Sequence, residues 1–144
     1  MTAFPFPFPS HHARLPALVL RTCGLAEGIV VVKVIGDVDL ATRSQLAGGL
    51  ARAIAHPAPA LLVCDLTGVD FLACTGVSAL AEARSELAGR GGTLRAVAPD
   101  RAVRRVLRIT GQFEPLGTVT DLRSALVGFA PVGATPLARK ARRA

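Results

Sequence analysis

The stretch that decides the fold of this chain is LLVCDLTGVDFLACTGV, residues 61–77. Its apolar start, residues 61–64, has the length and composition of a buried strand. We expect this strand to end at Thr67-Gly68 and a tight acidic loop to follow it. Thr75-Gly76 then begins an amphipathic segment that runs to about Arg90. The stretch therefore predicts a strand, a loop and a helix in succession.

Thr75 stands at the start of the predicted helix. The first N–H groups of a helix have no intrahelical partner, and together with the helix dipole they favour an anion such as phosphate. We therefore hypothesise that Thr75 is a phosphorylation switch, with its hydroxyl exposed on a protein-binding face near Asp37 and Asp39. The alternative is that Thr75 only caps the helix.

The composition suits one domain with an aliphatic core. The chain has 144 residues, 51% of them hydrophobic, with no Trp or Tyr. The formal charge is +7, but Cys23 to Gly128 holds 11 Lys/Arg and 10 Asp/Glu, a net of +1. Because nucleic-acid binders usually carry their excess charge on a folded face, we expect no specific nucleic-acid partner.

Cysteine usage and hydropathy exclude several further classes. Three cysteines without a CxxC pair favour neither a disulfide framework nor a zinc site, so we expect no metal and no cofactor. No uncharged apolar run reaches the ~18 residues of a membrane span. The start of the chain lacks the pattern of a secretory signal, so we expect a cytoplasmic protein without a membrane partner.

The chain divides into two tails and one domain. Residues 1–16 are rich in Phe and Pro, and we expect them to be disordered. Residues 17–129 carry the strand and helix patterns of the domain. Residues 130–144 form a basic tail that we also expect to be disordered.

Strand and helix patterns alternate through the domain in the order ββαβαβαβα. The predicted strands are 18–20, 29–35, 60–65, 93–98 and 116–120, and a helix follows each of the last four. This order predicts an α/β fold with a mixed, mostly parallel sheet that begins with a hairpin and is packed with about four helices. Parallel strands share one carboxyl edge, which gathers residues 36–39 and 66–75.

Three segments then carry a resemblance to a known family. They are Val34-Ile35-Gly36-Asp37-Val38-Asp39, the stretch from Asp65-Leu66 to Phe71-Leu72-Ala73-Cys74-Thr75-Gly76-Val77, and the stretch from Gly91-Gly92 through Ala98-Pro99 to Thr110-Gly111. In this order they resemble the STAS family, specifically its anti-anti-sigma factors, over roughly residues 15–128. The resemblance implies a single STAS domain.

The resemblance also implies a function. Proteins of this kind are not enzymes but regulators of transcription, in stress response or sporulation, that bind an anti-sigma factor and so release a sigma factor. That anti-sigma factor is a GHKL-type serine/threonine kinase. It phosphorylates the Ser or Thr before the loop glycine, here Thr75, and a phosphatase resets the protein.

The family's binding face maps onto a short set of residues in this chain. The expected partner contacts are Asp37, Asp39, Phe71, Leu72, Ala73, Cys74, Thr75, Gly76 and Val77. Ala73 and Cys74 stand where the family has Asp and Ser, so a STAS module that is never phosphorylated, for protein interaction or small-ligand sensing, is an alternative.

Other readings depend on single residues. A receiver-like phosphoacceptor domain would hold Mg²⁺ with carboxylates from Asp37, Asp39, Asp65 and Asp70, but it needs a later strand-end lysine, and the lysines are Lys33 and Lys140. A small hydrolase would need a histidine near its nucleophile, and His11, His12 and His56 fall in a tail or a turn. Cys74 is a candidate redox thiol. We expect the arginines of residues 101–108 to face solvent or a partner rather than DNA.

Overall fold

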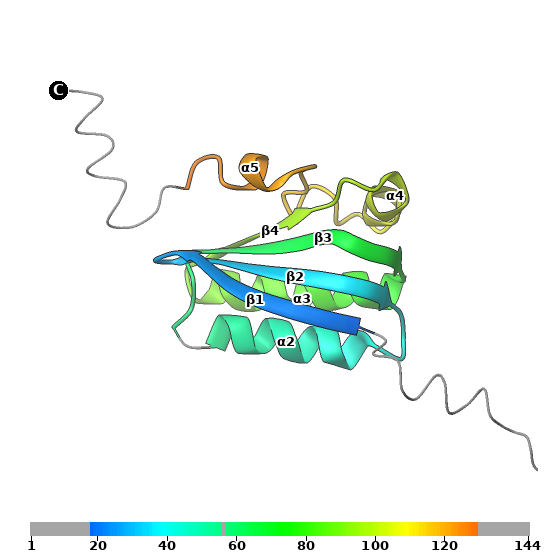
Figure 1. Ribbon diagram of the computed structural model, residues 1–144, viewed down its shortest axis with the longest axis horizontal. Coiled ribbons are helices and arrows are strands. Elements are labelled where there is room, and N and C mark those ends of the chain that lie inside the picture. The colour runs from blue at the N-terminus through cyan, green and yellow to red at the C-terminus, as the bar shows by residue number, and fades with distance from the viewer. Residues whose placement is uncertain (1–17, 56, 130–144) are drawn as a thin grey trace, which may run out of the picture.

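The computed structural model describes residues 18–55 and 57–129, so the two predicted tails and the three histidines lie outside the described residues. The described elements are arranged as an open sheet with helices packed against it (Figure 1). In chain order they are β1 (Leu18–Ala26), β2 (Ile29–Val38), α2 (Arg43–Ala55), β3 (Leu61–Leu72), α3 (Cys74–Gly89), β4 (Thr93–Val97), α4 (Arg101–Ile109) and α5 (Leu122–Ala125).

The sheet is mixed, as predicted. Its order is β1-β2-β3-β4, with β1 antiparallel to β2 and the remaining neighbours parallel. β1 and β2 form the expected hairpin, which turns at Gly28 with a φ of +84°. β1 runs to Ala26, well beyond the short strand predicted, because it stays paired with β2 almost to the turn.

Both faces of the central strands are buried, which explains their continuous apolar runs. Val32 and Val34 of β2 point into the main core, which lies between the sheet and the adjacent helices α2 and α3 (Figure 1). Val31 points to the opposite face and into a smaller core that includes Ala125 of α5. The sheet therefore needs helices on both sides.

β3 corrects the prediction of a short strand followed by a loop. The strand continues to Leu72, because two irregularities in its pairing with β2 absorb one extra residue each. The first lies where Gly68 passes β2, and a Cβ at Gly68 would stand 3.0 Å from Ile35 Cγ1 and 3.2 Å from the Val34 carbonyl oxygen. Thr67-Gly68 thus bends the strand and does not end it. β2 likewise runs to Val38, three residues further than predicted.

The predicted fifth strand at 116–120 is reduced to one bridge between Val97 and Val119. Backbone hydrogen bonds join Ala96 N–H to the Leu116 carbonyl and Ala98 N–H to the Val119 carbonyl, at 2.9 and 2.8 Å. Gly117 lies between them with a φ of +55°, which interrupts the extended conformation.

Two of the helices begin at an aspartate whose side chain caps the first turn. Asp100 Oδ1 accepts a hydrogen bond from Ala102 N–H at 2.7 Å at the start of α4. Asp121 Oδ1 accepts one from Ser124 N–H at 2.8 Å at the start of α5, and this bond holds the pKa of the Asp121 carboxyl below its usual value. α3 differs, because its N-cap residue is Ala73, which provides no side-chain cap. The alternative reading of Thr75 as the cap is therefore wrong.

Candidate functional site

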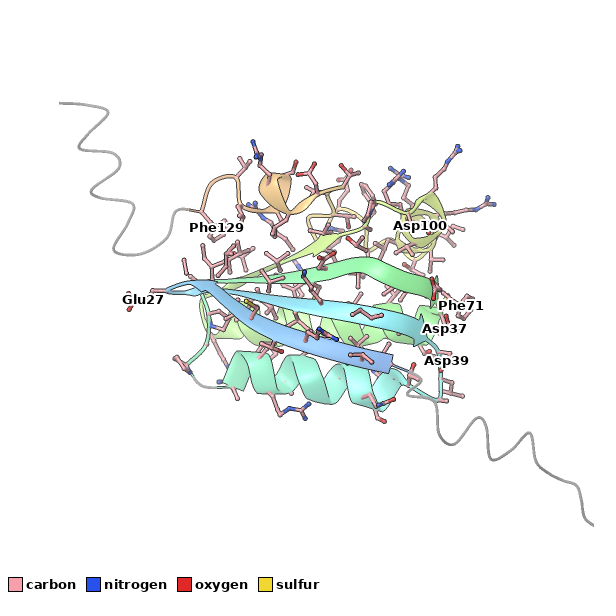
Figure 2. All side chains as sticks on the ribbon, viewed as in Figure 1. Glu27, Asp37, Asp39, Phe71, Asp100 and Phe129 are labelled. Atoms are coloured by element: carbon pink, nitrogen blue, oxygen red, sulfur yellow. The ribbon has the colours of Figure 1, made fainter. Side chains whose placement is uncertain are left out.

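The candidate site is the sheet edge where β2 and β3 end side by side. Asp37 pairs with Phe71 and Val38 with Leu72 in the parallel register. Ala73 N–H then donates to the Val38 carbonyl at 2.8 Å, so β2 stays joined to the chain as it enters α3. Figure 2 shows Asp37, Asp39 and Phe71 together at this end, with Glu27 of the hairpin turn at the other end.

Large apolar side chains are exposed at this edge. Phe71 is 53% exposed at the end of β3, and Leu40 is 77% exposed in the turn after β2. Asp37 and Cys74 are also exposed, and Asp39 is half-buried. Exposed phenylalanine and leucine beside carboxylates are typical of a protein-binding surface.

Leu40 was not among the residues predicted from the sequence. A signal for it exists, since Leu40 is a large apolar residue that precedes the helix and lies outside its buried stripe of Leu46, Leu50 and Ile54. An apolar residue in a turn without a place in the core is a candidate contact.

Three of the predicted contact residues belong to the core. Leu72 and Val77 are 3% and 2% exposed, and Gly76 is buried. A Cβ at Gly76 would lie 2.3 Å from Val38 Cγ1, which shows how closely α3 approaches the end of β2. These residues therefore position the edge. The other predicted contacts are accessible to a partner: Asp37, Phe71 and Cys74 are exposed, and Asp39, Ala73 and Thr75 are partly exposed.

The turn after β2 is held by hydrogen bonds from Thr42, which is 2% exposed. Its hydroxyl donates to the Asp37 carbonyl at 2.8 Å and accepts from Asp39 N–H at 3.0 Å. Thr42 N–H donates to Asp39 Oδ1, also at 3.0 Å. The acidic turn is thus preorganised, with its position fixed before any partner arrives.

Thr75 corrects one expectation. The residue is partly exposed, but its hydroxyl oxygen is buried and has no hydrogen-bond partner among the described residues. The hydroxyl is therefore not presented at the rim in this conformation. A buried hydroxyl without a partner costs free energy, so this arrangement favours any movement that gives the oxygen a partner.

Arg43, at the start of α2, is the side chain bound most directly to Thr75. Its Nε donates to the Thr75 carbonyl oxygen at 3.1 Å, and its Nη2 pairs with Glu82 Oε2 at 2.9 Å. Arg43 thus joins α2 to two turns of α3. This role could not be predicted from the sequence, because the contact joins residues 32 positions apart in the chain.

The edge is acidic as well as apolar. Within residues 18–55 and 57–129, the ion pairs are Arg43–Glu82 and Arg90–Glu86, so the carboxylates of Asp37, Asp39 and Asp70 have no cationic partner there. The complementary surface would carry basic and apolar side chains.

The structure does not support the magnesium site of the receiver-like alternative. No three His, Cys, Asp or Glu side chains of the described part gather as metal ligands, so Asp37, Asp39, Asp65 and Asp70 form no magnesium cluster.

Cys64 is fully buried, and burial, with a smaller contribution from Asp65, raises the pKa of its thiol to about 12. Among the helices described, none has the length and hydropathy to cross a bilayer.

The arginines of α4 divide into two kinds. Arg104 donates to the carbonyls of Ala98 and Pro99, and Arg108 lies 4.1 Å from the ring centre of Phe113. Arg101 and Arg105 are exposed beside Ile109, around an open cavity of about 420 Å³. Arg104 and Arg108 therefore make contacts within the domain, while Arg101 and Arg105 remain exposed.

Together these features define a class of protein. An open α/β sheet with a preorganised, acidic and apolar carboxyl edge is a binding module. A match to the STAS domain covers residues 25–125, and the chain belongs to that family.

Named relatives agree with this assignment. The chain is 33% identical over 103 residues to the anti-sigma-F factor antagonist RsfA of Mycobacterium tuberculosis, covering 69% of this chain and 79% of RsfA. It is 32% identical over 113 residues to the antagonist RsfB of the same species, covering 78% and 91%. The crystal structure of an anti-sigma factor antagonist from Mycobacterium paratuberculosis matches with a TM-score of 0.69 and 29% identity, covering 76% and 91%.

Proposed function

We propose that this chain is an anti-sigma factor antagonist, a regulator and not an enzyme, which binds an anti-sigma factor through the carboxyl edge of its sheet. The observation that carries the proposal is the exposed Phe71 and Leu40 at a preorganised edge whose carboxylates have no cationic partner among the described residues. The relatives' names give the partner class. Because a sigma factor acts on transcription, we place the activity in the cytoplasm.

We further propose that the partner is a GHKL-type kinase and that Thr75 is its substrate. The Thr75 hydroxyl oxygen would form a bond to the γ-phosphorus of ATP, the bond to the β-phosphate oxygen would break, ADP would leave and the hydroxyl proton would pass to a base of the kinase. A phosphatase would hydrolyse the phosphothreonine to reset the switch. The phosphate adds about −1.5 to −2 charge to a binding surface that already carries the carboxylates of Asp37 and Asp39. This added negative charge would weaken the binding of the anti-sigma factor.

The buried hydroxyl sets a condition on this reaction. Thr75 is partly exposed as a residue, and threonine in a helix occupies two side-chain rotamers. A rotation about its Cα–Cβ bond is the smallest movement that would turn the oxygen outward. The kinase would therefore act on a minor rotamer, and we expect slow phosphorylation.

The test of the switch is a titration of the protein with its cognate anti-sigma factor. We expect Thr75→Ala to bind as tightly as the wild type and Thr75→Glu to bind at least about tenfold more weakly, since tenfold corresponds to about 1.4 kcal/mol. Peptide mass mapping after incubation with that kinase and ATP should place one phosphate on Thr75. Equal affinities for the two variants would reject the switch, as would a phosphate elsewhere.

A second candidate is an antagonist that is never phosphorylated. The buried hydroxyl favours it, and so does Ala73, which replaces the acidic side chain expected next to the acceptor. This candidate predicts the same tight complex with the anti-sigma factor but no phosphate after incubation with kinase and ATP. Mass mapping therefore separates the two candidates.

A further inference from the structure

The Arg43 guanidinium already lies against the residue that would carry the phosphate. Its Nε is 3.1 Å from the Thr75 carbonyl oxygen, and its side chain is 30% exposed. Its Nη1 makes no hydrogen bond to the described residues, so the guanidinium retains donor capacity. A phosphate on Thr75 Oγ1 would therefore be attached to the same residue that the guanidinium already contacts.

The first turn of α3 supplies no competing negative charge. The N-cap residue Ala73 offers no side-chain hydrogen bond, and the first turn contains no acidic residue. The Thr75 hydroxyl itself is buried and has no hydrogen-bond partner in the described part of the chain, so no bond from those residues fixes it in place. A phosphate there would meet the free N–H groups of the turn as well as Arg43.

We propose that Arg43 is the cation that binds the phosphate of phosphorylated Thr75, and that it gives up Glu82 to do so. This inference rests on the proposed phosphorylation of Thr75. The Glu82 side chain is 67% exposed, and an exposed ion pair of this kind contributes little stability. A doubly charged phosphate can accept two hydrogen bonds from one guanidinium, which makes it the stronger partner.

Other charges around Thr75 act in the opposite direction. Asp37 and Asp39 lie at the end of β2, and Glu82 lies two turns along α3. All three would raise the second pKa of the phosphate, because they disfavour its dianion. Because the free N–H groups of the first turn would lower this pKa as Arg43 does, the contribution of Arg43 is the difference in pKa between the wild type and a variant without the guanidinium.

The experiment uses the full chain with phosphothreonine inserted at position 75 during synthesis, and follows the phosphate by ³¹P NMR as the pH is varied. We expect Arg43→Gln to raise the second pKa of the phosphate by about half a unit or more, because a cation within hydrogen-bond reach is removed. Arg43→Lys should restore part of the shift. The matched control is Arg90→Gln, which removes an equal charge from a 2.9 Å pair with Glu86 and should change nothing.

A measurement on the wild-type sequence protects the test against misfolded variants. The Arg43 Nε–H resonance should shift when phosphothreonine replaces threonine at position 75, while the Arg90 resonance stays in place. The same second pKa in wild type and Arg43→Gln, or an unmoved Arg43 resonance, would overturn the proposal. Neither measurement involves the kinase or the anti-sigma factor, so a failure of the proposed function would be seen separately.

Discussion

Gly76 shows how a single residue sets the distance between α3 and the sheet. We predict that Gly76→Ala lowers the free energy of unfolding by about 1 to 3 kcal/mol, because the added Cβ would lie 2.3 Å from Val38 Cγ1 in a packed core. Denaturant unfolding followed by circular dichroism measures the change.

Gly89 provides the control in the same helix. Apart from its chain neighbours and the backbone of the helix itself, no described atom lies within 4 Å of a Cβ built there, so Gly89→Ala should leave stability unchanged or raise it by up to about 1 kcal/mol. Similar losses for both variants would mean that helix propensity, and not the contact with Val38, decides the effect.

Cys64 gives the molecule a pH dependence at the alkaline end. Its thiol has a pKa of about 12 in the folded state, against 9.0 without burial, so unfolding releases a proton between these values. The contribution of this thiol to stability is therefore complete below pH 9 and falls as pH rises toward 12, by about 1.4 kcal/mol per pH unit at most.

Cys64→Ala should remove most of this slope, whatever it does to stability at neutral pH. Few other groups titrate in this pH range, because the chain has no tyrosine and its lysines are Lys33 and Lys140. Thermal unfolding of both proteins between pH 8 and 10.5 checks it, and an equal decline in both would assign the loss to other groups.

Thr75 marks the limit of sequence reasoning at this scale. The pattern predicted its place in the first turn of a helix, because strand and helix periodicities meet there. It predicted neither the burial of the hydroxyl nor the contact with Arg43. Both depend on how α2 packs beside α3, and packing between distant segments leaves no periodic trace in a sequence.

At the scale of elements, α3 lacks the side-chain cap that α4 and α5 possess. Ala73 has φ −85° and ψ 161°, an N-cap backbone conformation, but no side-chain oxygen. We predict that Ala73→Ser or Ala73→Asp raises the free energy of unfolding by about 1 kcal/mol, by accepting a first-turn hydrogen bond. Chemical denaturation measures this.

Asp100→Ala is the reciprocal variant, because it removes the bond to Ala102 N–H that begins α4. It should cost a similar amount, about 0.5 to 2 kcal/mol. If adding a cap at Ala73 had no effect while removing Asp100 did, the start of α3 would already be satisfied by another group.

The strands show which parts of an element a sequence predicts. Apolar, β-branched runs located β2, β3 and β4 correctly, since burial on both faces demands them. The ends were misplaced, because Gly68 serves a bulge in β3 and not a turn, and the two uses of glycine look alike in one sequence. At residues 116–120 the prediction was too long instead of too short, because Gly117 interrupts the extended conformation and leaves one bridge in place of a strand.

At the scale of the whole molecule, exposed apolar residues lie at both ends of the sheet, and only one end carries the proposed interface. Phe71 is 53% exposed at the carboxyl edge, while Leu25 near the end of β1 is 47% exposed. Leu25 is two residues before Glu27 of the hairpin turn, which Figure 2 shows at the end of the sheet opposite Phe71. The two side chains thus have similar exposure but lie at opposite ends of the sheet, so Leu25 serves as the control for Phe71.

The most direct test of the account is to measure, by calorimetric titration, how tightly the cognate anti-sigma factor binds the variants Phe71→Ser and Leu25→Ser. We predict that Phe71→Ser weakens binding at least about tenfold, as loss of a central aromatic contact does, while Leu25→Ser binds like the wild type. Undiminished binding by Phe71→Ser, or an equal loss in Leu25→Ser, would contradict the claim that the carboxyl edge of the sheet is the binding surface.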